Sequence, residues 1–87
     1  MLIEFDQGKQ VKTQQQRGLD FNDAAHIFSH VVAEKLDERF EYGEPRFITA
    51  GLLQGRLVIV VWTPRNNARR VISMRYANER EIKQFQR

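Results

Sequence analysis

The sequence predicts an α+β fold: an antiparallel sheet of four to five strands with two N-terminal helices and a short C-terminal helix. Three consecutive strand-like runs occupy residues 46–76 and predict the body of the sheet. Helix formers and helix-start signals occupy residues 7–29 and 78–85 and predict the helices around it. A chain of 87 residues is long enough for one core of this kind, so we expect a single domain over residues 1–87.

The centre of the predicted sheet is the run 57–63, which is uncharged and rich in β-branched and aromatic side chains. Such a run is typical of a strand that is covered on both faces. The apolar run 47–53 precedes it, and Gln54-Gly55 between them is typical of a two-residue hairpin turn, because glycine adopts a positive φ at no steric cost. The polar segment 64–67 predicts a second turn.

The last strand of this series, residues 69–76, alternates between two kinds of side chain. Alternation at period 2 predicts that Ile72 and Met74 lie on one face of the sheet. The opposite face is then predicted to display Arg69, Val71, Ser73 and Arg75. The strand therefore packs with one side and presents cations with the other, and the function is expected on the cationic side.

Local signals predict the first half of the chain. Residues 1–6 alternate and predict a short strand that joins the sheet, and the Gln-rich residues 7–17 predict a surface helix that ends at Gly18. Asp20 is a predicted N-cap for a second helix that begins at Phe21.

The strongly charged residues 31–44 predict an edge strand or a long hairpin. At the end of the chain, Asn78 can cap a last helix with Glu81 three positions later, and Ile82 with Phe85 gives that helix a small apolar stripe.

Charge is distributed unevenly along the chain. The net charge is only +3, but residues 61–87 contain seven of the 14 Lys and Arg residues and two of the 11 Asp and Glu residues. Local clustering of this kind is the footprint expected for a polyanionic ligand, and a solvated basic face without a ligand explains it equally well.

Composition excludes several classes of protein. The absence of Cys excludes disulfides, thiolate metal sites and a Cys nucleophile. No apolar run approaches the roughly 20 residues of a membrane span, and no signal pattern begins the chain, so we expect a cytoplasmic protein that does not enter a membrane. His26 and His30 have the spacing of a helical metal pair, but no third ligand accompanies them, so we predict neither a metal nor a cofactor.

Three groups of residues resemble the BrnT family of bacterial type II toxins. They cover nearly the whole chain in the order that the family shows: Phe5-Asp6-x-x-Lys9 with Arg17-Gly18-Leu19-Asp20-Phe21; Tyr42-Gly43-Glu44-x-Arg46-Phe47 with Gly51-Leu52-Leu53-x-Gly55-Arg56-Leu57; and Val60-Val61-x-Thr63-x-Arg65 with Arg70-x-Ile72-Ser73-x-Arg75-x-Ala77-x-x-x-Glu81.

The resemblance implies a RelE/ParE-like fold and a ribonuclease toxin that cuts RNA, inhibits translation and arrests growth. It also implies a partner, a BrnA-like ribbon-helix-helix antitoxin that holds the toxin inactive as a heterotetramer and binds operator DNA. The chain itself would meet DNA only indirectly, through that antitoxin. One position departs from the family: BrnT-like sequences often have Asn-x-x-Lys-His-Gly where this chain has Thr13-x-x-Gln16-Arg17-Gly18, so any acid–base role of that histidine must pass to another group.

RNA cleavage through the 2′-hydroxyl requires an activated oxygen, a protonated leaving oxygen and a stabilised phosphorane. A His pair is one solution, for which only His26 and His30 are available. A group of cations is the other, and the planar fork of Arg suits phosphate. We favour the cations and predict the catalytic residues Arg75, Arg65, Arg80 and Lys9. The predicted RNA-binding residues are Arg46, Lys12, Arg69, Arg70 and Tyr76, although Arg46 can instead pair with Glu44.

Two other classes of function stay open at this stage. The basic face can serve a non-catalytic binding module, which holds RNA or an acidic antitoxin segment without cleavage. The same superfold also carries gyrase-directed, ParE-like toxins, which inhibit a protein and need no nuclease site. Cleavage of purified RNA distinguishes the first reading from both alternatives.

Overall fold

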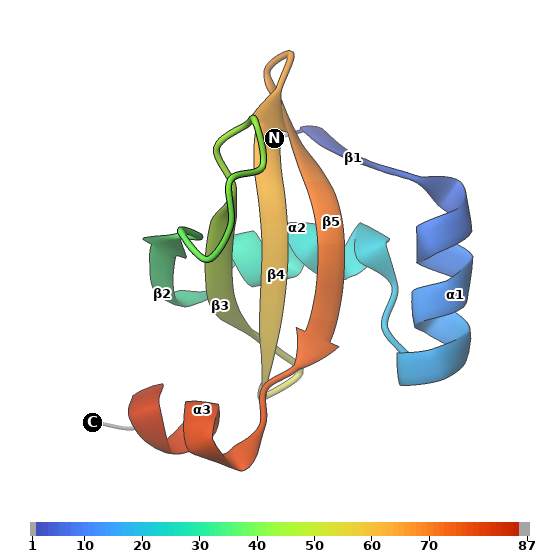
Figure 1. Ribbon diagram of the computed structural model, residues 1–87. Coiled ribbons are helices and arrows are strands. Elements are labelled where there is room, and N and C mark those ends of the chain that lie inside the picture. The colour runs from blue at the N-terminus through green and yellow to red at the C-terminus, as the bar shows by residue number, and fades with distance from the viewer. Residues whose placement is uncertain (1, 86–87) are drawn as a thin grey trace.

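The computed structural model describes residues 2–85 and contains a five-stranded sheet with helices on both faces (Figure 1). The strands lie in the order β1-β5-β4-β3-β2. Their bounds are β1 Leu2–Phe5, β2 Val31–Leu36, β3 Phe47–Leu53, β4 Arg56–Arg65 and β5 Ala68–Tyr76. The α+β class is confirmed, but the expectation of a wholly antiparallel sheet is wrong, because β1 pairs in parallel with β5. Two helices and three strands separate β1 from β5, and such a long connection permits parallel pairing.

The helices begin and end where local signals place them. Helix α1 (Gln7–Arg17) is capped by the side chain of Asp6 and ends at Gly18, whose φ of 68° closes the last turn onto the carbonyl of Gln14. The expected second helix is divided: a 3₁₀ helix, η1 (Phe21–Asp23), is capped by Asp20 and leads into α2 (Ala24–Ser29). Helix α3 (Glu79–Phe85) follows β5.

Two short turns fix the register of the three central strands. Gln54 and Gly55 have φ values of 51° and 78°, and Asn66 and Asn67 have values of 50° and 65°. Two consecutive positive φ angles match the twist of antiparallel strands and characterise the favoured two-residue hairpin. The predicted turn at Gln54-Gly55 is confirmed. The second turn is shorter than predicted, because Pro64 lies inside β4, beyond the last residue that pairs with β3.

A β-bulge at Ile72 changes the predicted facing of β5. The register with β4 shifts there, so that Val61 pairs with Ser73 and Trp62 pairs with Val71. An extra residue in one strand reverses the alternation of all residues on one side of it. The prediction that Val71 and Arg69 share a face with Arg75 is therefore wrong. Val71 is buried beside Met74, and the prediction that Ile72 packs with Met74 is wrong as well, since Ile72 is only partly buried.

The core lies between the sheet and the helical layer formed by η1 and α2. Its largest fully buried apolar side chains are Leu19, Phe21, Ile27, Val58, Val60, Val71 and Met74. A buried glutamine, Gln10, joins α1 to this layer by accepting a hydrogen bond from the backbone N–H of Phe21 at 2.6 Å. No helix within residues 2–85 is long and apolar enough to cross a membrane.

Helix α2 and the sheet approach one another closely at Gly51 of β3. A Cβ atom at this position would lie 2.5 Å from the carbonyl oxygen of Ile27 and 3.0 Å from that of His30. These are backbone atoms of α2 and its C-terminal cap, so they cannot move without displacing the helix. Glycine is therefore required here for packing.

We expect Gly51→Ala to lower the free energy of unfolding by about 1–3 kcal/mol, because the added methyl group forces α2 away from the sheet. Gly8→Ala in α1 is the matched control, since its Cβ would meet nothing closer than 3.6 Å and alanine favours a helix by about 0.5–1 kcal/mol. Urea titrations of both variants measure the difference. Equal stability of the two variants would show that α2 does not pack as described.

Candidate functional site

The sheet face opposite α2 carries a groove, and two rows of paired residues form its floor. One row runs across four strands as Lys35, Ile48, Val61 and Ser73, and the next as Ala33, Ala50, Ile59 and Arg75. At a strand spacing of about 4.8 Å, the two ends of each row lie about 14 Å apart. The groove encloses about 450 Å³. Its floor is apolar in the middle and cationic at both sides.

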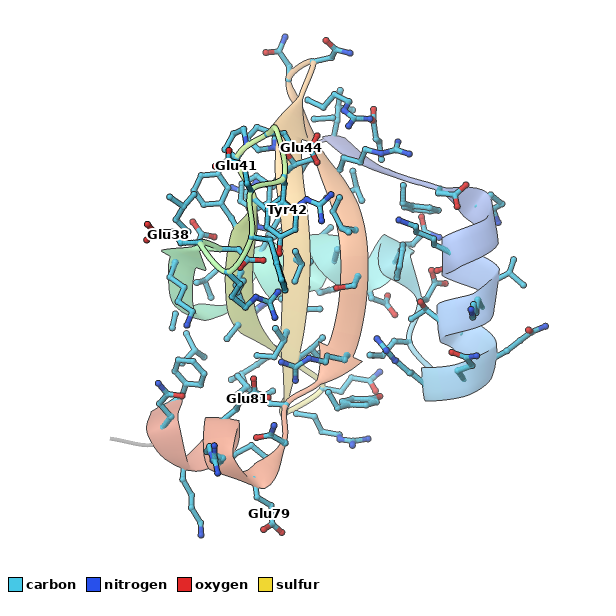
Figure 2. The ribbon with its side chains drawn as sticks, viewed as in Figure 1. Glu38, Glu41, Tyr42, Glu44, Glu79 and Glu81 are labelled. Carbon is cyan, nitrogen blue, oxygen red and sulfur yellow. The ribbon has the colours of Figure 1, made fainter. Side chains whose placement is uncertain are left out.

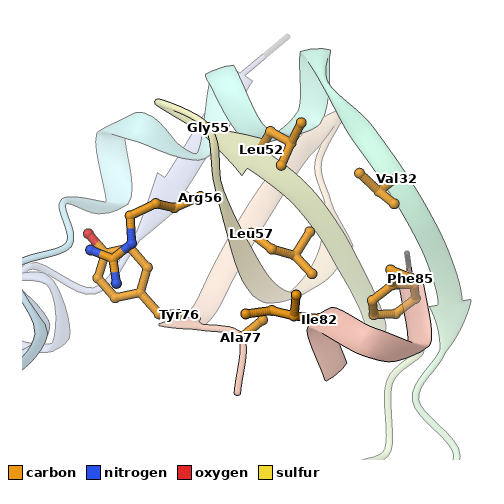
Figure 3. Close-up of a pocket in the computed structure, with 9 residues that line it drawn as sticks. All are labelled: Val32, Leu52, Gly55, Arg56, Leu57, Tyr76, Ala77, Ile82 and Phe85. Atoms are coloured by element: carbon orange, nitrogen blue, oxygen red, sulfur yellow. The ribbon is translucent and has the colours of Figure 1, made fainter. Parts of the chain in front are cut away.

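Two segments wall this groove, and both lie on the open face of the sheet (Figure 1). One wall is the 37–46 loop between β2 and β3, and the other is α3. Helix α3 rests on the sheet through Ile82 and Phe85, as predicted, beside an apolar hollow of about 410 Å³ that Val32, Leu52 and Leu57 also line (Figure 3). The walls are thus supplied by segments remote in sequence from one another.

Arg75 and Glu81 form the best-defined ion pair of the groove. Both terminal nitrogens of Arg75 donate to Glu81, Nη1 to Oε1 and Nη2 to Oε2, at 2.7 Å each. Figure 2 shows Glu81 directed from α3 toward the sheet and Glu79 directed away from it. The hydrogen bonds from Arg75 lower the pKa of Glu81 to about 2, and those to Glu81 raise the pKa of Arg75. Glu81 therefore holds the guanidinium of Arg75 in a fixed position against α3.

The same carboxylate also begins α3. The side chain of Asn78 accepts a hydrogen bond from the N–H of Glu81 at 2.9 Å, and Glu81 Oε1 accepts one from the N–H of Asn78 at 3.0 Å. This reciprocal arrangement is the capping box, which confirms the predicted start of the helix. Glu81 therefore links the start of α3 to a cation of the sheet.

The 37–46 loop is organised around a buried carboxylate, Asp37. Its side chain accepts hydrogen bonds from Arg39 Nε at 2.8 Å, from Arg39 Nη2 at 2.9 Å and from the Tyr42 hydroxyl at 3.0 Å. These bonds, led by those from Arg39, hold the pKa of Asp37 well below its ordinary value even though burial alone would raise it. Arg39 remains largely exposed and lines the groove.

Arg17 reaches the groove from the last turn of α1. Its Nη1 donates to the carbonyl of Met74 at 2.8 Å, and the side chain lies among the residues that line the groove. This is the position at which the resemblance leads one to expect histidine. A permanent cation therefore stands where a titratable group was expected.

Of the nine predicted site residues, the structure places Arg75 in the groove and the others elsewhere. Arg46 and Arg65 share the carboxylate of Glu44, each at 3.2 Å, so the alternative reading of Arg46 as an ion-pair residue is confirmed. Arg65 is the last residue of β4, six positions along the strand from Ile59, the partner of Arg75, so the two arginines lie roughly 20 Å apart. These two arginines form a separate cluster at the other end of the 37–46 loop.

The other predicted residues of β5 also lie outside the residues that line the groove. Arg69 lies over the rings of Phe28 and Trp62, on the helix-covered face, and Arg70 pairs with Glu4 of β1 at 3.1 Å. Tyr76 stacks under Arg56, whose guanidinium carbon is 3.6 Å from the ring centroid. The predicted residues outside the sheet are also outside the residues that line the groove: Lys9 and Lys12 are exposed on α1, and Arg80 is exposed on α3.

Three groove cations were not predicted from the sequence: Arg17, Lys35 and Arg39. Lys35 sits in the charged edge strand, and its register with Ile48 is what points it into the groove. A local signal does precede Arg39, because an Asp in a turn-rich segment often accepts a hydrogen bond from the N–H two residues later, as Asp37 does from Arg39. Arg17 has no such signal.

The two histidines lie on another part of the surface. His26 and His30 border a hollow with Gly18 and Tyr76, and His30 Nδ1 is 2.8 Å from the carbonyl oxygen of His26. Within the described residues, no three side chains of His, Asp or Glu converge in a way that would hold a metal ion. His26 and His30 therefore lie apart from the arginines that line the groove.

We expect Glu81→Gln to lower the free energy of unfolding at neutral pH by about 1–3 kcal/mol, because it weakens two charge-assisted hydrogen bonds and a helix cap. The pKa of Glu81 is lowered from 4.5 to about 2, so its contribution is complete above pH 4.5 and is lost as the pH falls toward 2. The stability difference between wild type and variant should shrink over this interval in urea titrations. The control is Glu79→Gln, whose effect should stay near 0.5 kcal/mol, and an equal effect of both variants would contradict the assignment.

One family profile matches this chain over residues 5–81, from β1 to the carboxylate that holds Arg75. The family is described as the ribonuclease toxin BrnT of type II toxin–antitoxin systems. No curated protein sequence matches the chain. The resemblance drawn from the three groups of motifs is thereby confirmed, and the match spans strands β2 to β5, the 37–46 loop and the start of α3. The chain belongs to the BrnT family of ribonuclease toxins of type II toxin–antitoxin systems.

Proposed function

We propose that this chain is a metal-independent endoribonuclease that binds RNA across the groove of the open face and cleaves it beside Arg75. The observation that carries the proposal is the meeting of cations from four elements over one apolar floor. These cations are Arg17 of α1, Lys35 of β2, Arg39 of the 37–46 loop and Arg75 of β5. A cationic groove about 14 Å wide suits one strand of RNA, whose phosphates contact the rim and whose bases lie over the floor.

The proposed reaction is attack of a ribose 2′-oxygen on the adjacent phosphorus, which forms a 2′,3′-cyclic phosphate as the bond to the 5′-oxygen breaks. The 2′-hydroxyl gives its proton to solvent water, and the departing 5′-oxygen takes a proton from solvent water. Negative charge develops on the phosphorane oxygens, and a guanidinium that is already in place stabilises it without reorganisation. Arg75 is in place because Glu81 holds its two terminal nitrogens from one side. Its Nε–H and the second hydrogen of Nη2 are left for phosphate, because Nη1 also donates to the carbonyl of Tyr76 at 3.5 Å. Positioning and charge thus supply the rate, with no histidine in the groove.

The partner in this proposal is a BrnA-like ribbon-helix-helix antitoxin, present with the toxin in a heterotetramer. An inhibitor of this site has to cover the groove cations, so we propose that acidic side chains of the antitoxin lie over them. Binding to DNA would then be a property of the antitoxin alone. Inhibition of translation and arrest of growth follow from RNA cleavage.

We expect Arg75→Ala to cleave a defined RNA about 10²-fold more slowly than wild type, because it removes a cation that contacts the phosphorane. Arg75→Lys should recover only part of the rate, since it keeps the charge and loses the fork. Glu81→Gln keeps the cation of Arg75 but weakens the hydrogen bonds that hold it. Its cleavage rate therefore shows how much the fixed position of Arg75 contributes, apart from its charge. Arg56→Ala is the matched control, an exposed arginine stacked on Tyr76 outside the groove.

Single-turnover cleavage and melting temperatures are the measurements for these four variants. A wild-type rate for folded Arg75→Ala would place the chemistry elsewhere. Absence of cleavage by the wild type on any RNA, with or without ribosomes, would favour a non-catalytic inhibitor.

We expect induced expression of the chain alone to arrest growth, and co-expression of its ribbon-helix-helix partner to restore it. In vitro, the affinity of the partner should fall as the salt concentration rises, because the proposed contacts are between opposite charges at the protein surface. Calorimetry at low and high salt measures this dependence, with the toxin variant Arg75→Ala binding more weakly than Arg56→Ala. Normal growth at high, verified protein levels would contradict the toxin activity of this chain, and a salt-independent affinity would place the interface away from the groove.

A further inference from the structure

The most completely hydrogen-bonded side chain outside the core is Asp37, at the base of the 37–46 loop. Its carboxylate is fully buried, and it accepts four hydrogen bonds: from the Nε, Nη2 and backbone N–H of Arg39, at 2.8, 2.9 and 3.2 Å, and from the hydroxyl of Tyr42 at 3.0 Å. Its own N–H donates to the carbonyl of Arg46 at 2.7 Å and closes the loop. Burial of a carboxylate costs free energy, which such a complete set of partners offsets.

This arrangement fixes the direction of Arg39. Two nitrogens on one side of the guanidinium are bound to Asp37, so the remaining terminal nitrogen points away from the carboxylate. The side chain is 61% exposed and lines the groove together with Arg75. An exposed arginine ordinarily samples many rotamers, whereas this one is held from behind.

Arg39 and Arg75 line the same groove, so their positive charges act on one another. Hydrogen bonds with Glu81 raise the pKa of Arg75, and burial and the positive charge of Arg39 act in the opposite direction. Two like charges facing one groove are unfavourable until an anion lies between them. Each guanidinium has its own carboxylate, Asp37 for Arg39 and Glu81 for Arg75, so both keep their positions when the groove is empty.

We propose that Arg39 is the second arginine on the scissile phosphate, opposite Arg75, and that Asp37 is the positioning residue that directs it there. This inference rests on the proposed ribonuclease function and adds to it a residue pair from the 37–46 loop. The loop is then part of the catalytic site and not only a connection between β2 and β3. The competing reading is that Asp37, Arg39 and Tyr42 merely fold the loop.

A double-mutant cycle distinguishes these readings. We expect Arg39→Gln to slow single-turnover cleavage about 10²-fold and Asp37→Asn about 10-fold, because the latter leaves the cation present but undirected. If Asp37 acts through Arg39, the double variant is no slower than Arg39→Gln alone. Arg56→Gln is the matched control and should cleave at the wild-type rate.

A second readout does not depend on cleavage. Binding of a short 2′-O-methyl RNA, which cannot be cleaved, is measured over a range of KCl concentrations. Loss of one phosphate contact should reduce the slope of log K against log[KCl] by about 0.7 in Arg39→Gln, and Arg56→Gln should leave it unchanged. A residue that only folds the loop would lower the affinity without changing the slope in this way.

The outcomes separate this inference from the proposed function. The inference is overturned if the rate reductions of Arg39→Gln and Asp37→Asn multiply fully in the double variant. It is also overturned if Arg39→Gln leaves the salt slope unchanged. In both cases the ribonuclease proposal stands, provided that Arg75→Ala still cleaves slowly. Failure of wild type to cleave RNA would remove the ribonuclease proposal, and the salt slope would still test the phosphate contact. Arg39→Gln leaves the carboxylate of Asp37 buried without its cation, which can prevent folding. The double variant Asp37→Asn with Arg39→Gln has no buried carboxylate at this position, so its cleavage rate and salt slope then supply the two measurements.

Discussion

The single extra residue in β5 decides which side chains can meet on the open face. Because Ile72 bulges out of the register with β4, Ser73 and Arg75 point into the groove while Val71 enters the core. Without the bulge, a continuous strand would bring Arg69 to the face of Arg75 and expose Val71. The bulge thus places Arg75 and Arg69 of the same strand on opposite faces of the sheet. Arg75 lines the groove, and Arg69 covers the aromatic rings of the core.

Carboxylates determine how the arginines of the open face are held. Asp37 fixes Arg39, Glu81 fixes Arg75, and Glu44 holds both Arg46 and Arg65. Such pairs contribute little to stability where they are exposed, but they restrict the rotamers of long side chains. A site made of flexible cations would lose conformational freedom on binding phosphate. In this protein, folding already restricts part of the conformational freedom of these arginine side chains.

Local chemistry allowed much of the fold to be predicted from the sequence. The hairpin at Gln54-Gly55, the end of α1 at Gly18 and the capping box between Asn78 and Glu81 each depend on residues within a few positions. The groove was harder to predict, because its cations come from three separate parts of the chain, at residue 17, at residues 35 and 39 and at residue 75. No local pattern reveals a bulge at Ile72, since the alternation on either side of it looks continuous.

The pairing of β1 with β5 joins the two ends of the chain, with Glu4 bound to Arg70 across 66 positions. During synthesis, the first strand therefore has no neighbour until the last strand has emerged, and contacts of this length form late and slowly. Arg75 and the helix that tethers it emerge later still. A nascent chain therefore cannot assemble the groove before β5 and α3 have emerged, because Arg75 and its carboxylate Glu81 lie in these two elements.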